Sequence, residues 1–585
     1  MENKNVHLKE MLPTIKKVIS YAKPHKAYFF LSILFGFLAI GLNMFLPVLL
    51  GWAIDCTIGK GSVDFERLTR VLVLIGIQAV SSAVFEWFEV YFENVLTNKT
   101  EQSIRDKCFE KINRMPIKYI DNKPHGDIMS TIINDVGNIT DGFLSGFKSI
   151  LSGVVTIVSV IIFMVMINVP MALIVIVLSP LSLLISLYIS KKSKKLYKAR
   201  VDELGQLSAY SEEMLGNIKV VKAFNNEKKN VEEFKKLNGL LYKSSERASY
   251  YASLAGPCSR FVNGTLYAIV AVAGAFVCIG GHISIGQVST FLSYVDNFTS
   301  PFNDLASIVA DIQVSVASAN RVFDLLEEQD EVSDADNINI LNCNGEVKLQ
   351  DVNFSYTPQS KLIENLNVTA LKGQKVAIVG PTGCGKSTII NLLMRFYDID
   401  GGKILVSNRD IKKVTRKSLR NCYGMVLQES WLYNATIREN IAYGKPDATM
   451  DEIIEASKLA NAHTFIEKLS DGYDTIITEN ADNISAGQKQ LLCIARAMLM
   501  KPPMVILDEA TSNIDTRTEM KIQEALDYIM QGRTCFIVAH RLSTIVNADT
   551  ILVMNKGRII EQGTHEELLA KNGFYTQLFN SQFGG

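Results

Sequence analysis

The sequence predicts two dissimilar parts, a bundle of membrane-spanning α-helices followed by an α/β domain. Long apolar stretches are confined to the first half, and from Glu346 onward runs of β-branched residues alternate with helical patterns. The chain has 585 residues, 48% of them hydrophobic and 21% charged, and its mean hydropathy is +0.15. This value is too high for an ordinary soluble enzyme and too low for a protein that lies wholly in a membrane. It therefore fits a chain with two unlike halves.

The composition excludes several classes of protein. Lys plus Arg and Asp plus Glu each number 60, so no net charge favours a nucleic-acid partner. The nine cysteines form no CxxC pair, which argues against a zinc cluster and against a disulfide framework. Apolar side chains are plentiful and long low-complexity runs are absent, so disorder is not a main feature of the chain.

Six apolar stretches in the first half predict six transmembrane helices. Each is close to or above the length of about 20 residues that a helix needs to cross the hydrocarbon core. They cover residues 28–54, 71–96, 146–169, 171–189, 251–279 and 285–309. The first is too long for the apolar part of a signal peptide, and no small-residue cleavage site follows it. We therefore interpret it as an uncleaved span.

The basic residues between these stretches predict the orientation of the chain. The segment before the first span carries six Lys and Arg residues, residues 97–145 carry seven and residues 190–249 carry fourteen. The alternate loops carry three, none and none. Because basic loops remain on the cytosolic side, both termini are predicted to be cytosolic, with the protein located in the cell membrane.

The long basic segments have helical periodicity, which predicts that the spans continue into the cytosol as helical extensions. An acidic connector, Glu327 to Glu331, follows the last extension. We therefore predict a transmembrane domain over residues 1–329 and a cytosolic domain over residues 330–585.

The second domain contains a predicted phosphate-binding loop at residues 380–388. The predicted strand Lys375–Val379 leads into GPTGCGKST, which matches the P-loop pattern GxxxxGK[ST] between a strand and a helix. Its backbone N–H groups and the helix N-terminus suit the phosphates of ATP. Lys386 is expected to contact the β- and γ-phosphates, and Ser387 to coordinate Mg²⁺. The predicted nucleotide-binding residues here are Gly380, Pro381, Thr382, Gly383, Cys384, Gly385, Lys386, Ser387 and Thr388.

A second predicted strand ends in two acids, in the sequence MVILDE over residues 504–509. Asp508, at the carboxyl end of the strand, is expected to coordinate Mg²⁺. Glu509 is expected to act as the general base that polarises the attacking water.

Between these two motifs lies NISAGQKQLLCIARAM, which resembles the signature motif of ATP-binding cassette (ABC) proteins. The resemblance implies that Tyr356 stacks on adenine, that Gln428 is the Q-loop glutamine near Mg²⁺, that residues 512–515 form the D-loop, and that His540 is the switch histidine. The expected catalytic residues are then Lys386, Gln428, Glu509 and His540, and the expected metal ligands are Ser387, Gln428 and Asp508.

The layout of the whole chain resembles a half-transporter of the ABC exporters, with one six-span domain and one cassette. Residues 116–121 and 216–224 resemble the coupling helices that dock onto the nucleotide domains of that family. The resemblance implies a dimer, in which Ser485, Gly487 and Gln488 of one chain complete the ATP site of the other.

The signature departs from the family pattern, because residues 484–488 read ISAGQ where the usual sequence is LSGGQ. A Cβ atom at Ala486 restricts the backbone where the helix N-terminus should meet phosphate. The preceding segment, residues 478–483, is also altered. The chain therefore resembles one subunit of the heterodimeric multidrug exporters, and a heterodimer is favoured over the alternative, a working homodimer.

Acidic residues in the predicted spans suggest what is carried. One face of the second span carries Gln78, Ser82, Glu86, Glu89 and Glu93; the sixth span carries Asp296, Asp304 and Asp311. An ion pair between Arg260 and Asp304 is plausible, and Phe298 and Phe302 add aromatic surface. Such a cavity favours amphipathic cations. Alternatively Glu89, Glu93, Asp304 and Asp311 are solvated on the cytosolic extensions, which leaves Glu86 and Asp296 as the deeper acids.

The predicted function is ATP-driven export of small amphipathic molecules by alternating access, with ATP and Mg²⁺ as cofactors and a second half-transporter as partner. The alternatives within the class are a lipid or peptide exporter. Outside it, the alternative is an ATP-gated channel or regulatory subunit.

Overall fold

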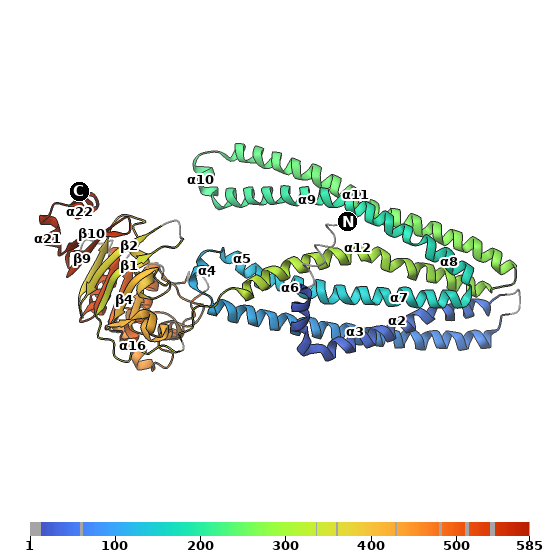
Figure 1. Cartoon of the computed structure of the whole chain (residues 1–585), viewed down its shortest axis with the longest axis horizontal. Helices are drawn as coiled ribbons and strands as arrows, with labels where there is room; N and C mark the ends of the chain where they lie inside the picture. Colours follow the sequence, from blue (N-terminus) through green and yellow to red (C-terminus); the bar gives the residue numbers. More distant parts are fainter. Residues whose placement is uncertain are drawn as a thin grey trace. The chain divides into compact units, whose positions relative to one another are not determined.

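The computed structural model describes residues 13–58, 63–334, 336–357, 361–427, 430–478, 483–508, 514–538 and 545–583. The chain forms two compact units (Figure 1). The first unit is made of Met1–Arg114 and Lys123–Glu328, and the second of Met115–Asn122 and Gln329–Gly585. The second unit therefore includes a short segment from the middle of the helical half as well as the whole α/β half.

The described residues of the first unit are almost entirely helical. Its helices are η1 (Lys23–His25), α2 (Lys26–Asp55), α3 (Phe65–Arg114), α5 (His125–Ser130), the π-helical turns η2 (Thr131–Asp135) and η3 (Asp141–Ser145), α6 (Val136–Thr140), α7 (Gly146–Ile167), α8 (Val169–Leu178), α9 (Pro180–Gly216), α10 (Ile218–Ala223), α11 (Glu227–Ile279) and α12 (Ile285–Glu327). α9 and α11 run side by side and are joined by α10 (Figure 1).

Several of these helices are much longer than a membrane is thick. α3 has 50 residues and α11 has 53, which is about 75–80 Å of helix against a hydrocarbon core of about 30 Å. Long extensions outside the membrane follow, as the sequence predicted.

Four helices of the described chain are long and apolar enough to cross a membrane, namely Pro13–Asp55, Phe65–Arg114, His125–Ile167 and Glu227–Ile279. The other two predicted spans lie in α8 with the start of α9, and in α12. The count of six spans therefore remains a prediction.

α2 and α12 approach each other closely at the ends that the charge pattern predicts to be extracellular. A Cβ atom on Gly286 would lie 2.0 Å from the carbonyl oxygen of Gly51, so a larger side chain cannot fit there. The Asp55 carboxylate accepts hydrogen bonds from the Gly286 N–H and the Ser284 hydroxyl, both at 2.7 Å. Since an unpaired N–H group at a helix N-terminus needs an acceptor, Asp55 fixes the start of α12 against the end of α2.

The second unit contains two β-sheets. The four-stranded sheet has the order β2 (Ile363–Ala370), β1 (Val347–Phe354), β4 (Gly401–Val406) and β5 (Arg409–Asp410), and all its pairs are antiparallel. The six-stranded sheet has the order β10 (Arg558–Gly563), β9 (Thr550–Asn555), β3 (Lys375–Val379), β8 (Thr534–Val538), β7 (Met504–Asp508) and β6 (Tyr423–Val426). β9 through β6 are parallel, and β10 runs antiparallel at the edge.

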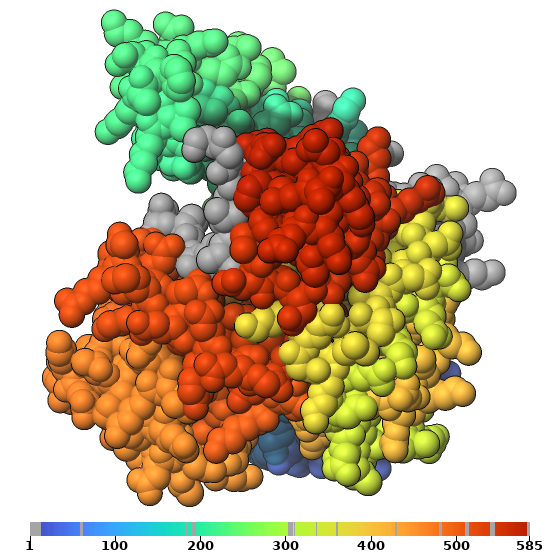
Figure 2. Space-filling model, turned by 90° about the vertical axis from the view of Figure 1, so that its left-hand side faces the viewer, coloured from blue at the N-terminus to red at the C-terminus, as the bar shows by residue number. Residues whose placement is uncertain are grey.

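Helices complete the second unit. They are α4 (Ile117–Asp121), α13 (Lys386–Leu393), η4 (Ile411–Lys413), α14 (Arg416–Arg420), α15 (Ile437–Ala442), α16 (Met450–Leu459), α17 (His463–Ile466), η5 (Gly472–Asp474), α18 (Ala486–Leu499), α19 (Thr516–Met530), α21 (His565–Ala570) and α22 (Phe574–Phe583). In Figure 2 the C-terminal segment, in red, lies against yellow residues of the antiparallel sheet, as the contacts between β10 and β2 require.

Candidate functional site

The phosphate-binding loop lies at the carboxyl end of β3, between that strand and α13. β3 is buried from Val376 to Val379, so the rigid centre of the sheet positions the loop. Gly380 and Gly385 have φ angles of +156° and +104°, which L side chains rarely adopt. A Cβ atom on Gly380 would also lie 2.3 Å from the carbonyl oxygen of Met554. The loop therefore requires glycine at both positions.

Lys386 folds back over this loop. Its ammonium group donates hydrogen bonds to the carbonyl oxygens of Gly380 at 2.8 Å and Pro381 at 3.2 Å. Thr382, Gly383 and Ser387 are exposed beside it, whereas Cys384 is buried. A cation and an exposed hydroxyl group thus lie together at the mouth of the loop.

The predicted adenine-binding residue Tyr356 lies next to the same helix. Its hydroxyl group lies 3.3 Å from the Thr388 hydroxyl and accepts a hydrogen bond from the Asn391 amide at 3.2 Å. Its ring contacts the rings of Phe354 and Tyr397 edge-on. The structure therefore brings Tyr356 to the phosphate-binding helix, and its hydroxyl group is already bonded there.

The acid predicted to bind Mg²⁺ lies at the same edge of the sheet. Asp508 ends β7, which runs parallel to β3 with β8 between them. At about 4.8 Å per strand, the carboxyl ends of β7 and β3 are about 10 Å apart. Gln428, Glu509 and His540, as well as residues 512 and 513 of the D-loop, lie outside the described residues. In the sequence, Gln428 follows the end of β6 by two residues, Glu509 follows β7 by one, and His540 follows β8 by two.

The signature residues form the start of α18. The Ser485 hydroxyl accepts from the N–H of Gln488 at 3.3 Å, and the Gln488 amide oxygen accepts from the N–H of Ser485 at 2.8 Å. This reciprocal pair is a capping box. In the described part of the chain these bonds lie within the first turn of α18.

Ala486 and Gly487 differ sharply in what surrounds them. Ala486 is the exposed first residue of α18 and its φ angle is not positive. Gly487 is buried, and a Cβ atom there would lie 2.4 Å from the methyl group of Thr518. The described backbone at Ala486 is an ordinary helical conformation, which suits alanine. Compared with the glycine of the usual signature, Ala486 adds one exposed methyl group at the N-terminus of α18.

The two segments that resemble coupling helices have different surroundings. α4 belongs to the second unit, where Ile117 packs against the core and Asp121 accepts a hydrogen bond from the Tyr397 hydroxyl. α10 belongs to the first unit and lies between two exposed apolar residues: Leu215, near the end of α9, is 70% exposed, and Phe224, directly after α10, is 73% exposed.

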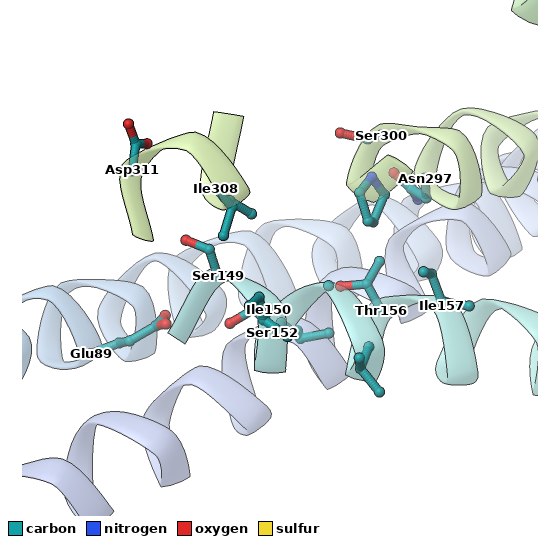
Figure 3. Close-up of a pocket in the computed structure, with 14 residues that line it drawn as sticks. Glu89, Ser149, Ile150, Ser152, Thr156, Ile157, Asn297, Ser300, Ile308 and Asp311 are labelled. Carbon is teal, nitrogen blue, oxygen red and sulfur yellow. The ribbon is translucent and has the colours of Figure 1, made fainter. Parts of the chain in front are cut away.

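A cavity of about 640 Å³ opens between α2, α3, α7 and α12 of the first unit (Figure 3). Ser149, Ser152 and Thr156 line it at spacings of three and four residues, which places them on one face of α7. Asn297 and Ser300 of α12 lie opposite, and Ile40, Ile150, Ile157 and Ile308 supply apolar wall. Glu89 and Asp311 lie at one end of it, on different helices (Figure 3).

A partly buried ion cluster lies beside Glu89 at this end of the cavity. The Lys148 ammonium lies 3.0 Å from a Glu89 carboxylate oxygen and also pairs with Glu93. Glu89 is only 8% exposed, and Gly36 of α2 leaves room for it, since a Cβ atom there would lie 2.8 Å from its carboxylate. Two carboxylates share one ammonium group, so the cluster carries a net negative charge.

The other predicted polar residues of the spans have varied surroundings. Glu86, Asp296 and Arg260 have exposed side chains. Gln78 is buried and donates a hydrogen bond to the carbonyl oxygen of Leu42 at 3.0 Å, Ser82 is buried, and Phe298 is buried in the core of its unit. The side chains of Phe302 and Asp304 lie outside the described residues, so the predicted pair with Arg260 is not described. Lys148 was missed, although a lysine within the apolar stretch 146–169 was a signal for it.

Both parts of the chain match known protein families. Residues 29–302 match the profile of the ABC transporter transmembrane region, and residues 363–512 match that of the ABC transporter nucleotide domain family, described as "ABC transporter". A "Fatty acid ABC transporter ATP-binding/permease protein" of Mycobacterium bovis is 41% identical over 540 residues, 92% of this chain and 85% of the relative. The chain belongs to the ABC transporters. Its ATP-binding domain and its transmembrane domain are thus confirmed.

Two further relatives extend the comparison. A "Putative multidrug export ATP-binding/permease protein YgaD" of Bacillus subtilis is 36% identical over 575 residues, 97% of this chain and 99% of that protein. A structure titled "Structure of a bacterial Atm1-family ABC exporter with ATP bound" matches with a TM-score of 0.76 and 27% identity, covering 95% of this chain and 98% of that one. This ABC transporter therefore has the exporter fold, is a membrane ATPase coupled to transport, and holds its nucleotide-binding domain in the cytosol. ABC exporters work as dimers.

Proposed function

We propose that this chain is one subunit of a dimeric exporter that uses ATP to move amphipathic small molecules out of the cell by alternating access. The observation that carries the proposal is the membrane cavity of about 640 Å³, which has apolar walls and an acidic end. It belongs to a chain that also carries a complete phosphate-binding loop.

The nucleotide site fits Mg²⁺-ATP in its chemistry. The loop offers backbone N–H groups and the Lys386 ammonium to phosphate oxygens, and the exposed Ser387 hydroxyl and the Asp508 carboxylate are the hard oxygen ligands that Mg²⁺ prefers. We assign Ser387, Asp508 and Gln428 to Mg²⁺, Glu509 to the attacking water, His540 to the γ-phosphate and Tyr356 to adenine. Ser485, Gly487 and Gln488 are assigned to the ATP held by the partner.

The cavity is lined by the acidic residues Glu89 and Asp311 at one depth in the membrane and by the neutral residue Asn297 at another. Glu89 lies 24 residues into α3 and Asp311 lies 26 residues into α12, so both carboxylates are about 36–39 Å from the extracellular ends of their helices, near the cytosolic face of the membrane. Asn297 lies 12 residues into α12, about 18 Å along it and therefore near the middle of the bilayer. An amphipathic cation fits this division, with its charge at the carboxylates and its apolar part deeper.

The name of the Mycobacterium relative favours a second candidate, fatty acid transport. A fatty acid carries a carboxylate, which the excess negative charge of Glu89, Glu93 and Asp311 would repel. The charge of the cavity therefore supports the cation over the fatty acid.

Transport into inverted membrane vesicles tests these candidates. With the proper dimer present, ATP should drive uphill accumulation of a fluorescent lipophilic cation, and Glu509→Gln vesicles should show none. Preferential accumulation of a fluorescent fatty acid would overturn the substrate assignment. ATP-dependent ion conductance without accumulation of either probe would make the protein a channel.

A cavity variant links the result to the site. Asp311→Asn removes one charge without changing shape, and we expect it to raise the half-saturating concentration of the cation about fivefold, or about 1 kcal/mol. The matched control is Glu86→Gln, which removes a charge from an exposed position of α3. Equal effects of the two variants would contradict a specific role of the cavity.

We propose a heterodimer, because the signature sequence is altered while Lys386 and Asp508 are those of a competent site. The exposed apolar residues on either side of α10, Leu215 and Phe224, support a partner of either kind, since they need a surface to cover them. Native mass spectrometry of the chain expressed with its genomic neighbours tests this. A mass of two identical chains would make the transporter a homodimer.

A further inference from the structure

A basic turn leads into the first helix that is long and apolar enough to cross the membrane. Residues 11–54 contain four lysines and no acidic residue. The turn is η1, which begins at Lys23, and α2 follows it directly at Lys26. Both lysines are exposed, and neither makes an ion pair with a residue that the structure describes.

Two tyrosines hold this turn in place, one before it and one after it. Before the turn, the Tyr21 ring stacks on Phe323 of α12 with the ring centres 6.0 Å apart, and the Lys107 ammonium of α3 lies 4.4 Å from the centre of the Tyr21 ring. After the turn, the Lys99 ammonium of α3 lies 4.8 Å from the centre of the Tyr28 ring and donates a hydrogen bond to the Tyr28 hydroxyl at 3.3 Å. The turn is thus fixed at both ends, and η1 itself contacts α3.

Lys99 brings a third cation to the turn. Its side chain is exposed, and it makes no ion pair within the described ranges of the chain. The acids of α3 nearest to it in the sequence, Glu93 and Glu101, are each paired with another basic residue. The lysine cluster, Lys23, Lys26 and Lys99, therefore carries positive charge that an external anion can neutralise.

The lysine cluster lies where α2 leaves the membrane. The apolar stretch 28–54 is about 40 Å of helix, against about 30 Å for the hydrocarbon core and about 40–45 Å for the core with its headgroup layers. Tyr28 therefore falls in the headgroup layer of the cytosolic leaflet. An exposed aromatic pair supports this level, because Trp87 and Tyr91 stack 5.7 Å apart and such residues collect at membrane interfaces. Phe92, whose ring contacts the rings of Tyr91 and Tyr28, places the pair beside the turn.

The chemistry of this position favours a lipid over a free anion. A lysine ammonium binds phosphate as a point charge, and basic residues next to a membrane attract anionic lipids. Two residues after Tyr28, the side chain of Phe30 is 64% exposed, so apolar surface for an acyl chain lies next to the cations. A ligand that carries both a phosphate group and acyl chains would use both surfaces.

We propose that the lysine cluster is a binding site for an anionic phospholipid of the cytosolic leaflet. The phosphodiester group of the lipid contacts the three ammonium groups, and its acyl chains lie along the exposed aromatic side chains of α2 and α3. The site is separate from the membrane cavity, so the proposal does not depend on which substrate is carried.

Native mass spectrometry of the transporter, purified in a non-ionic detergent and freed of bound lipid, tests the site. The protein is titrated with dioleoyl phosphatidylglycerol and, separately, with dioleoyl phosphatidylcholine, which has the same acyl chains but no net charge. Because each lysine near an anionic lipid strengthens binding about fivefold, we expect phosphatidylglycerol to bind about tenfold more tightly or better. Equal affinities for the two lipids would overturn the proposal.

Two double variants with the same loss of charge separate a site from a general effect of charge. Lys23→Gln/Lys26→Gln should weaken phosphatidylglycerol binding about tenfold and leave phosphatidylcholine binding unchanged. The control, Lys228→Gln/Lys229→Gln, removes two exposed lysines from the first turn of α11, about 75 Å from its other end and so outside the membrane. It should bind phosphatidylglycerol like the wild type, and equal losses in the two variants would contradict a specific site.

The wild-type protein supplies a check that does not depend on how a variant folds. Raising ammonium acetate from about 0.1 M to about 1 M shortens the Debye length from about 10 Å to about 3 Å, so the preference for phosphatidylglycerol should fall severalfold. A preference that salt leaves unchanged would show that the lysine charges do not recognise the headgroup. Inorganic phosphate at the concentration of the lipid should not displace it, because phosphate has no acyl chain. Displacement would make the cluster a site for free phosphate and overturn the lipid assignment.

Discussion

In the nucleotide-binding unit the functional side chains come from short motifs, whereas in the membrane unit they come from helices that are far apart in the sequence. Gly380, Lys386 and Ser387 follow one strand within a few residues, so the position of that strand places all three. Gly36, Glu89 and Lys148 come from α2, α3 and α7 and meet only because those helices pack together. The first kind of site depends on local conformation, and the second depends on helix packing.

This difference predicts which substitutions affect chemistry and which affect folding. Changes at the edge of the parallel sheet should alter ATP turnover while the protein stays folded. Changes in the ion cluster of the membrane unit should alter stability and transport together.

The largest effect is expected for Glu509→Gln. Removal of the general base should lower ATP turnover about 100-fold or more while ATP binding is retained. Hydrolysis by the dimer and ATP binding by the same preparation are the two measurements. Wild-type turnover in a dimer that contains no unsubstituted copy of this chain would show that another group activates the water.

The next largest effect is expected for Lys148→Met, which leaves the buried Glu89 and the half-buried Glu93 without their cation. Loss of one partner of a buried ion pair costs about 3–5 kcal/mol, so the melting temperature of the protein in detergent should fall strongly. The double variant Lys148→Met/Glu89→Gln should recover part of the loss, because one unpaired charge is removed. A single variant as stable as the wild type would mean that the cluster is hydrated and not buried.

Two substitutions in the signature compare the effect on stability of a methyl group at buried Gly487 with that of a methyl group at exposed Ala486. Gly487→Ala places a methyl group against Thr518 and should cost about 1–3 kcal/mol through overpacking. Ala486→Gly, one residue earlier, removes an exposed methyl group and should cost about 1 kcal/mol or less. Melting temperatures measure both effects, and a reversed order would contradict the close packing of α18 on α19.

Ala486 also shows what a motif does not specify. Read against LSGGQ, the alanine suggested a restricted backbone, and the described backbone there is ordinary helix. A motif gives the residue at a position and not its φ angle, so the conformation at Ala486 could not be deduced from it.

The phosphate-binding loop was predictable because strand, loop and helix are contiguous, and each glycine has a local reason. The pairing of Lys148 with Glu89 was not, because nothing in the spacing of α3 and α7 fixes how two helices face each other.

The smallest effect is expected at Tyr356, where two contributions can be separated. Tyr356→Ala removes the ring and should weaken ATP binding about tenfold or less, since an aromatic stacking contact contributes about 0.5–1.5 kcal/mol. Tyr356→Phe keeps the ring and removes only the hydrogen bonds to Thr388 and Asn391. If the ring stacks on adenine, ATP titration should give the phenylalanine variant nearly wild-type affinity and the alanine variant the full loss. Equal losses in both variants would mean that Tyr356 acts by holding α13 through its hydroxyl group, which would make this tyrosine part of the packing of the unit and not part of its ATP contact.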